Sequence, residues 1–71
     1  MKELETKNSI GKNIRGLRLK TGVSQDRLSK LADLSLNTIV KIESGGNKNP
    51  TIVTLSKIAK ILNVRVDDLI K

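Results

Sequence analysis

The side chains best suited to chemistry lie in segment 36–44, where a carboxamide and an ammonium group are one helical turn apart. On a helix, Asn37 and Lys41 lie on the side opposite the apolar Ile39 and Ile42. A carboxamide can offer a donor and an acceptor together to the edge of adenine, and an ammonium can reach guanine or a phosphate. The segment is therefore suited to reading base edges in DNA. Alternatively, the same side chains only solvate an exposed helix.

Two apolar side chains accompany this polar pair. Leu36 and Val40 have little reason to face water, and each could meet the methyl group of thymine. A single exposed apolar residue is nevertheless ordinary, so Val40 alone is not diagnostic. The predicted base contacts are Leu36, Asn37, Val40 and Lys41.

Groups that could bind phosphate lie on either side of this segment. Gln25 opens an expected helix, whose free N-terminal amides attract an anion. The other candidates flank segment 36–44, follow it closely, or lie on the outer side of the helix expected at 9–21. The predicted phosphate contacts are Gln25, Thr38, Ser44, Lys48, Asn49 and Arg15, with Lys12 near Arg15.

The composition agrees with an anionic partner. Fourteen Lys and Arg against seven Asp and Glu give a net charge of +7 on 71 residues. Such an excess most often indicates nucleic acid, although a basic surface also aids solubility. The chain has no Phe, Tyr or Trp. Because proteins that bind single strands commonly stack bases on aromatic rings, double-stranded DNA is favoured.

The absence of Cys and His excludes several classes of site. Disulfides, Cys/His zinc sites, thiol nucleophiles and imidazole bases are all impossible. We therefore predict a chain that is not an enzyme and has no metal or cofactor. No apolar run approaches about 18 residues and no signal peptide opens the chain, so we expect a cytoplasmic protein associated with the nucleoid and no membrane.

Five helices and no strand are predicted, in one all-α domain over 9–71 after a flexible N-terminal tail, 1–8. Apolar residues recur three or four positions apart. Ser24, Ser35 and Thr51 stand where hydroxyl groups can cap helix N-termini. The expected helices span about 9–21, 25–32, 36–44, 52–62 and 66–70.

A tight turn at Asp33-Leu34 joins the helices expected at 25–32 and 36–44. Two short helices joined in this way must cross steeply, so one can enter a major groove while the other lies across the backbone. In the first of them we expect Leu28, Leu31 and Ala32 to face inward.

A set of residues between Gly11 and Leu69 forms a familiar pattern. It comprises Ile14, Arg15, Leu17 and Arg18; Gly22, Val23, Ser24, Gln25 and Leu28; Leu34, Ser35, Thr38, Ile39, Ile42, Glu43 and Gly45; and Pro50, Thr51, Leu55, Ile58, Ala59, Leu62 and Val64. In this pattern the sequence resembles the helix-turn-helix domain of phage-repressor and Cro type, also called the xenobiotic-response-element (XRE) family. The resemblance implies a compact, five-helix, lambda-repressor-like domain that binds operator DNA as a homodimer.

The resemblance also implies roles for individual residues. It assigns Gln25 to a phosphate or to bracing the reading helix, and positions such as Leu36, Asn37 and Lys41 to base edges. It implies an ion pair between Arg18 and Glu43. Each of these two charges lies about 40° from the centre of its buried helix side, so both can be partly desolvated. Two solvated charges are the alternative.

Four residues depart from the family pattern. Asp33 stands where Gly is usual, and Asp tolerates a positive φ better than most residues. Ser29 replaces Ala, and its hydroxyl could bond to its own helix. Leu36 replaces a polar residue, so we expect no side-chain brace from Gln25. Arg65 stands in place of a Ser cap.

Because the given sequence ends soon after the helix expected at 66–70, we expect no separate dimerisation domain of the kind that larger repressors carry. We therefore expect the domain itself to dimerise. The alternative is that the chain is one domain of a longer protein. The predicted interface is Ile61, Val66 and Ile70, with Val53 as a further candidate. Packing of these residues into the core is the alternative.

Together these observations predict a sequence-specific transcriptional regulator that binds double-stranded DNA. We expect a repressor that reads an inverted-repeat operator as a homodimer, with helix 36–44 in the major groove. The alternative is a protein-interaction module, such as the antitoxin of a toxin–antitoxin pair, whose toxin partner would cover Asn37 or the C-terminal helices.

Overall fold

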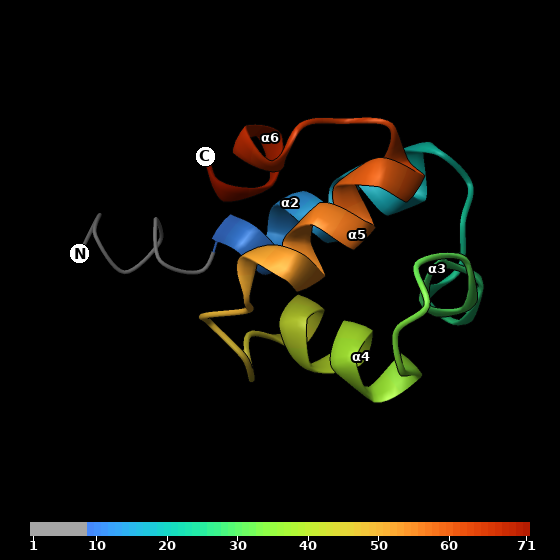
Figure 1. Ribbon diagram of the computed structural model, residues 1–71, viewed down its shortest axis with the longest axis horizontal. Helices are drawn as coiled ribbons and strands as arrows, with labels where there is room; N and C mark the ends of the chain where they lie inside the picture. The colour runs from blue at the N-terminus through green and yellow to red at the C-terminus, as the bar shows by residue number, and fades with distance from the viewer. Residues whose placement is uncertain (1–8) are drawn as a thin grey trace.

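The computed structural model describes residues 9–71, which form five α-helices and no strand (Figure 1). The helices are α2 (Ser9–Lys20), α3 (Gln25–Leu31), α4 (Leu36–Ser44), α5 (Ile52–Leu62) and α6 (Val66–Ile70). The predicted all-α, five-helix fold is thus confirmed. The tail predicted at 1–8 lies outside the described residues. No helix of this part of the chain combines the length and apolarity needed to cross a lipid bilayer.

Hydroxyl groups fix where three of the helices begin. The oxygen of Ser24 accepts a hydrogen bond of 3.0 Å from the backbone N–H of Arg27, at the start of α3. Ser35 and Thr51 make the equivalent bonds of 3.1 Å at the starts of α4 and α5. Each bond satisfies an amide that has no partner within its helix, so these residue types specify the helix starts locally.

Four of the described helices, α2 to α5, are followed within two residues by a residue in the left-handed backbone region. Gly22 has φ 76° and Gly45 has φ 87°, a conformation that costs glycine little. Asn63 closes α5 with φ 60°, and Asp33 takes φ 58° in the turn between α3 and α4. Asp33 therefore adopts the conformation that the family pattern gives to glycine.

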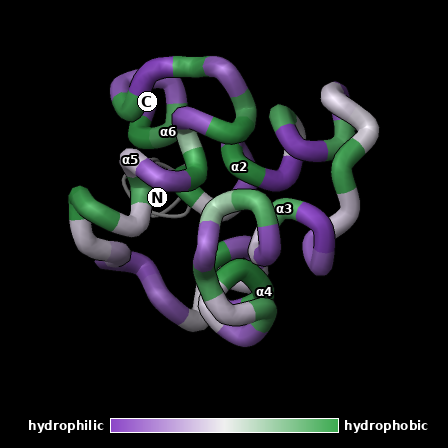
Figure 2. The backbone as a smooth tube through the Cα atoms, turned by 45° about the vertical axis from the view of Figure 1, so that its right-hand side comes forward, coloured by the Kyte–Doolittle hydropathy of each residue, from purple (hydrophilic) through white to green (hydrophobic). Residues whose placement is uncertain are grey.

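All five helices contribute to one apolar core. The fully buried side chains are Ile14, Leu28, Ile39, Ile42, Ile58 and Leu69. Figure 2 shows hydrophobic and hydrophilic residues alternating along the helices, as expected where each helix turns one side to a shared core.

The prediction that Leu31 faces the core is wrong. Leu31 is exposed, because the buried side of α3 is formed by Leu28, Ser29 and Ala32. At about 100° per residue, Leu31 lies about 100° from the middle of that side. Ser29 is buried there, and its hydroxyl donates to the carbonyl of Asp26 at 2.7 Å, as its place in the pattern suggested.

Helix α4 lies along the lower edge of the molecule in Figure 1 and packs against α2 and α3. The first turn of α2 approaches the end of α4 so closely that a Cβ at Gly11 would collide with the carbonyl oxygen of Ile42. At the opposite side, Asn13 donates to the carbonyls of Leu69 and Lys71 at 2.9 and 3.1 Å, which ties the end of α6 to α2.

Arg65, the residue before α6, carries no side-chain acceptor for a helix cap. A side chain inside α6 stabilises the start of the helix instead: the carboxylate of Asp68 accepts a hydrogen bond of 3.0 Å from the backbone N–H of Arg65. This bond lowers the pKa of Asp68, and the nearby Lys71 lowers it further.

Candidate nucleic-acid interface

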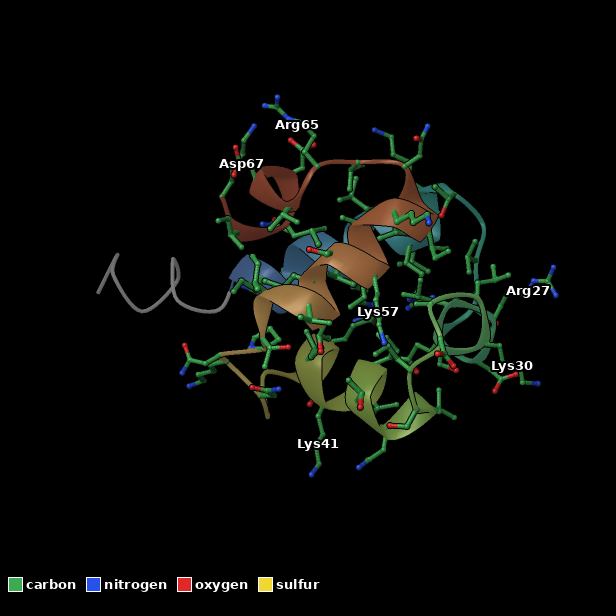
Figure 3. All side chains as sticks on the ribbon, viewed as in Figure 1. Arg27, Lys30, Lys41, Lys57, Arg65 and Asp67 are labelled. Atoms are coloured by element: carbon green, nitrogen blue, oxygen red, sulfur yellow. The ribbon has the colours of Figure 1, made fainter. Side chains whose placement is uncertain are left out.

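Helix α4 turns its four predicted base-contacting side chains to solvent. Asn37 and Lys41 are exposed, and Leu36 and Val40 are 42% and 39% exposed. In Figure 3, Lys41 projects from α4 away from the body of the protein, at the edge opposite Arg65 and Asp67. We call Leu36, Asn37, Val40 and Lys41 the reading face.

A buried ion pair holds α4 against the rest of the domain. Arg18 of α2 donates to both carboxylate oxygens of Glu43 in α4, from Nε to Oε2 at 2.7 Å and from Nη2 to Oε1 at 3.0 Å. The two side chains are only 9% and 4% exposed. Nη1 of the same arginine donates to the carbonyl of Val23 at 2.8 Å. A planar, two-bond contact of this kind fixes angle as well as distance, so the orientation of α4 is well defined.

Gln25, at the start of α3, is bonded to the same carboxylate. Its Nε2 donates to Oε1 of Glu43 at 3.1 Å. The expectation that Gln25 has no side-chain brace is therefore wrong, because the acceptor comes from the end of α4 rather than from position 36. A carboxamide nitrogen carries two hydrogens, so one remains for another acceptor. The first backbone amides of α3 are also without helical partners, since Ser24 caps Arg27 alone.

Two of the residues predicted to bind phosphate, Ser44 and Lys48, line a shallow depression at the end of α4. Its lining residues are Lys12, Glu43, Ser44, Gly45 and Lys48. The depression brings together a lysine from the first turn of α2 and a lysine from the loop after α4, residues 36 positions apart in the sequence. Because the carboxylate of Glu43 is already paired with Arg18, the two lysines dominate the charge at its rim.

Hydroxyl groups near α4 differ in how free they are to bind phosphate. Ser44 donates its single hydrogen to the carbonyl of Lys41 at 3.1 Å and accepts from the backbone N–H of Gly46 at 3.3 Å. A phosphate contact from Ser44 would therefore break an existing bond. Thr38 shares a hydrogen bond of 2.8 Å with Ser35, which uses one of the two hydroxyl hydrogens and leaves the other available.

Two further predicted phosphate contacts are exposed but isolated from this depression. Arg15 lies on the solvent side of α2, and Asn49 lies in the loop before α5. The backbone N–H of Asn49 donates to the side chain of Asn47 at 3.0 Å, which shapes that loop and leaves the Asn49 side chain in solvent.

The residues predicted to form a dimer interface are not equally available. Ile61 and Val66 are half-buried and pack against the core, whereas Ile70 is exposed. The most exposed large apolar side chains of residues 9–71 are Ile52 and Val53, in the first turn of α5. From the sequence, Val53 was only a further candidate for the interface. Helical periodicity alone could not show which of these apolar residues are buried and which are exposed.

Two short helices joined by a tight turn, with the second exposing a polar and basic side, define the helix-turn-helix class of DNA-binding domain. Residues 14–69 match the helix-turn-helix family of XRE type. The chain therefore belongs to this family of DNA-binding transcriptional regulators.

Individual relatives agree with this assignment. An uncharacterized HTH-type transcriptional regulator of Archaeoglobus fulgidus is 39% identical over 56 residues, which cover 79% of each chain. The N-terminal DNA-binding domain of SinR from Bacillus subtilis superimposes with a TM-score of 0.88 at 30% identity, covering 90% of this chain and 93% of that one.

Two further structures are similar. The restriction-modification controller protein C.AhdI from Aeromonas hydrophila gives a TM-score of 0.83 at 28% identity, over 89% of this chain and 94% of that one. The structure of SinR, the master regulator for biofilm formation, in complex with DNA gives a TM-score of 0.85 at 31% identity. The superposition covers 87% of this chain and 98% of that one.

Proposed function

We propose that this chain binds double-stranded DNA in a sequence-specific manner as a homodimer and represses transcription from an inverted-repeat operator. The reading face carries the proposal, because its exposed carboxamide and ammonium groups stand on a helix whose orientation is fixed by buried bonds. SinR, whose fold is similar, has been solved in complex with DNA.

In this proposal α4 enters the major groove and two anchors beside its last turn bind the DNA backbone. At the first anchor, the first amides of α3 and the remaining Nε2 hydrogen of Gln25 bind one phosphate. At the second anchor, Lys12 and Lys48 bind another phosphate in the depression that they line. Because Glu43 bonds to Gln25 and also lines this depression, the two anchors lie on either side of the same carboxylate.

The number of phosphates that lysine and arginine side chains neutralise sets how this binding should respond to salt. Each phosphate that a lysine or arginine neutralises releases counterions, so the logarithm of affinity falls by about 0.9 per unit of log salt for each one. A nearly flat salt response would contradict the two-anchor arrangement.

For the homodimer we propose an interface that includes Ile70 and the exposed pair Ile52 and Val53, with Ile61 and Val66 at its inner edge. A twofold axis would place two copies of α4 in successive major grooves, about 34 Å apart. A dimer bound in this way would occupy promoter DNA and exclude other proteins from it, which is the physical basis of the proposed repression.

The test compares Asn37→Ala with Lys48→Ala on duplexes that carry every single-base change of a preferred site. Asn37→Ala should lose about 1–3 kcal/mol of discrimination at one base position and keep its affinity for unrelated DNA. Lys48→Ala should weaken binding to all duplexes alike and reduce the salt slope by about one unit. If Asn37→Ala lost the same affinity on every sequence, the proposed role of the reading face would be wrong.

A further inference from the structure

Two rows of side chains run along the reading face. Residues four apart on a helix are neighbours at its surface, so Leu36 and Val40 form an apolar row, and Asn37 and Lys41 form a polar row beside it. The apolar row spans about 6 Å along the helix, since each residue rises about 1.5 Å. This is just under two base-pair steps of about 3.4 Å.

Packing within residues 9–71 does not account for the apolar row. The buried side of α4 is formed by Ile39 and Ile42, while Leu36 and Val40 keep about two fifths of their surface in solvent. Leu34, two positions before Leu36, shows that the fold can cover such a residue, because it packs against the core. The apolar row therefore remains available to something outside the domain.

The surroundings of the apolar row favour duplex DNA over an apolar protein surface. The adjacent polar row would be left desolvated under an apolar partner, at a cost in free energy. The lysine-lined depression lies next to the last turn of α4, and the chain carries a charge of +7. The occupant must combine anionic groups with an apolar group in a groove that admits a helix.

We infer that Leu36 and Val40 bind the C5-methyl groups of pyrimidines in the major groove. This inference rests on the proposed function and specifies part of its substrate. Among the four bases only thymine offers an apolar group on that edge. A methyl group on C5 of cytosine occupies the same place, so the apolar row accepts 5-methylcytosine as well as thymine. The affinity of the protein for its site is then sensitive to cytosine methylation.

The experiment uses a preferred duplex and versions of it changed at one thymine position at a time, with uracil opposite adenine, or with cytosine or 5-methylcytosine opposite guanine. Binding is followed by the anisotropy of labelled DNA, because the chain has no aromatic residues. At positions facing the apolar row, uracil should weaken binding about fourfold for each methyl group removed, which corresponds to about 0.8 kcal/mol. There 5-methylcytosine should bind about fourfold more tightly than cytosine.

Two variants test whether the apolar row is responsible. Leu36→Ala combined with Val40→Ala should bind thymine and uracil duplexes equally, and should keep the base preference of the polar row. Leu19→Ala, which removes an exposed leucine on α2, should retain the preference for thymine over uracil. Circular dichroism of each variant establishes that the fold is intact.

The outcomes separate this inference from the proposed function. Sequence-specific binding with equal affinity for thymine and uracil would overturn the methyl-binding role and leave the proposed function standing. Equal affinity for all duplexes, with no preferred sequence, would overturn both. Loss of the methyl preference in Leu19→Ala would also overturn the role of the apolar row.

Discussion

The ion pair between Arg18 and Glu43 yields the largest predicted effect of a single substitution on stability. Glu43→Ala removes both charge-assisted bonds of 2.7 and 3.0 Å and leaves the guanidinium with the carbonyl of Val23 at 2.8 Å. Because only 7% of the surface of Arg18 is exposed, water cannot replace the lost carboxylate without rearrangement. The Nε2 group of Gln25 loses its acceptor as well.

The expected loss is about 3–5 kcal/mol, the usual cost of leaving one partner of a buried pair uncompensated. A 71-residue domain at about 0.05–0.15 kcal/mol per residue has a total stability of about 4–11 kcal/mol. The substitution therefore removes about a quarter of the stability or more. At about 4–8 °C per kcal/mol, the melting temperature should fall by at least about 12 °C.

Circular dichroism during urea and thermal unfolding is the appropriate assay, because the chain has no Trp or Tyr to report by fluorescence. Lys30→Ala is the matched control. It removes an ion pair with Asp26 at 3.2 Å whose side chains are 74% and 58% exposed. An exposed pair of this type contributes at most about 0.5 kcal/mol.

A second variant separates the loss of a partner from the loss of volume. Arg18→Met combined with Glu43→Leu replaces the whole pair by apolar side chains, which is often neutral for a buried pair. It should be more stable than Glu43→Ala. The reasoning fails if Glu43→Ala unfolds like Lys30→Ala, or if the double variant is as unstable as Glu43→Ala.

Further predictions concern backbone conformation and the loss of stability at low pH. Gly16→Ala should raise the free energy of unfolding by about 0.5–1 kcal/mol, because Ala has the better helix propensity and a Cβ there meets no atom within 4 Å outside its own helix backbone among the described residues. Gly11→Ala should lower it, since a Cβ would collide with the carbonyl of Ile42; equal effects of the two changes in urea unfolding would contradict this. Asp33→Gly should stabilise by about 1 kcal/mol, because φ is 58°, and an unchanged urea midpoint would refute the strain. The pKa of Asp68 is lowered from 3.8, chiefly by the Arg65 N–H, so its stabilising contribution is complete above pH 3.8 and is lost as pH falls through the lower folded-state pKa. In Asp68→Asn the melting temperature should therefore fall less steeply as the pH is lowered into the acid range. A dependence of melting temperature on pH equal to that of the wild type would contradict the assignment.

Local chemistry made the helix starts predictable. Ser24, Ser35 and Thr51 each form the expected cap, because a hydroxyl three residues before an amide is sufficient to satisfy it. The same holds for Asp33, whose short polar side chain tolerates a left-handed conformation.

Contacts that depend on tertiary packing could not be predicted in this way. The bond from Gln25 to Glu43 requires the crossing of α3 over α4, and that from Asn13 to Leu69 joins residues 56 positions apart. The burial of Leu69 was also not predicted, because α6 has five residues and is too short for an apolar period to be recognised.

The reading face occupies an intermediate position between these cases. Helical periodicity predicted that Asn37 and Lys41 would be exposed, since Ile39 and Ile42 define a clear buried side. The depression lined by Lys12 and Lys48 was beyond the reach of periodicity, because it forms only where the first turn of α2 meets the end of α4. The individual side chains could thus be named from sequence, but their assembly around this depression could not.

The most direct test of the central claim is selection of bound sequences from a random pool of duplex DNA at about 0.15 M salt, where screening is physiological. The account predicts an enriched inverted repeat whose half-site centres lie about one helical turn apart, as expected for a dimer that places α4 in successive major grooves. Tight binding at low salt with no enriched sequence would contradict it, because only the electrostatic attraction of a basic surface would then remain.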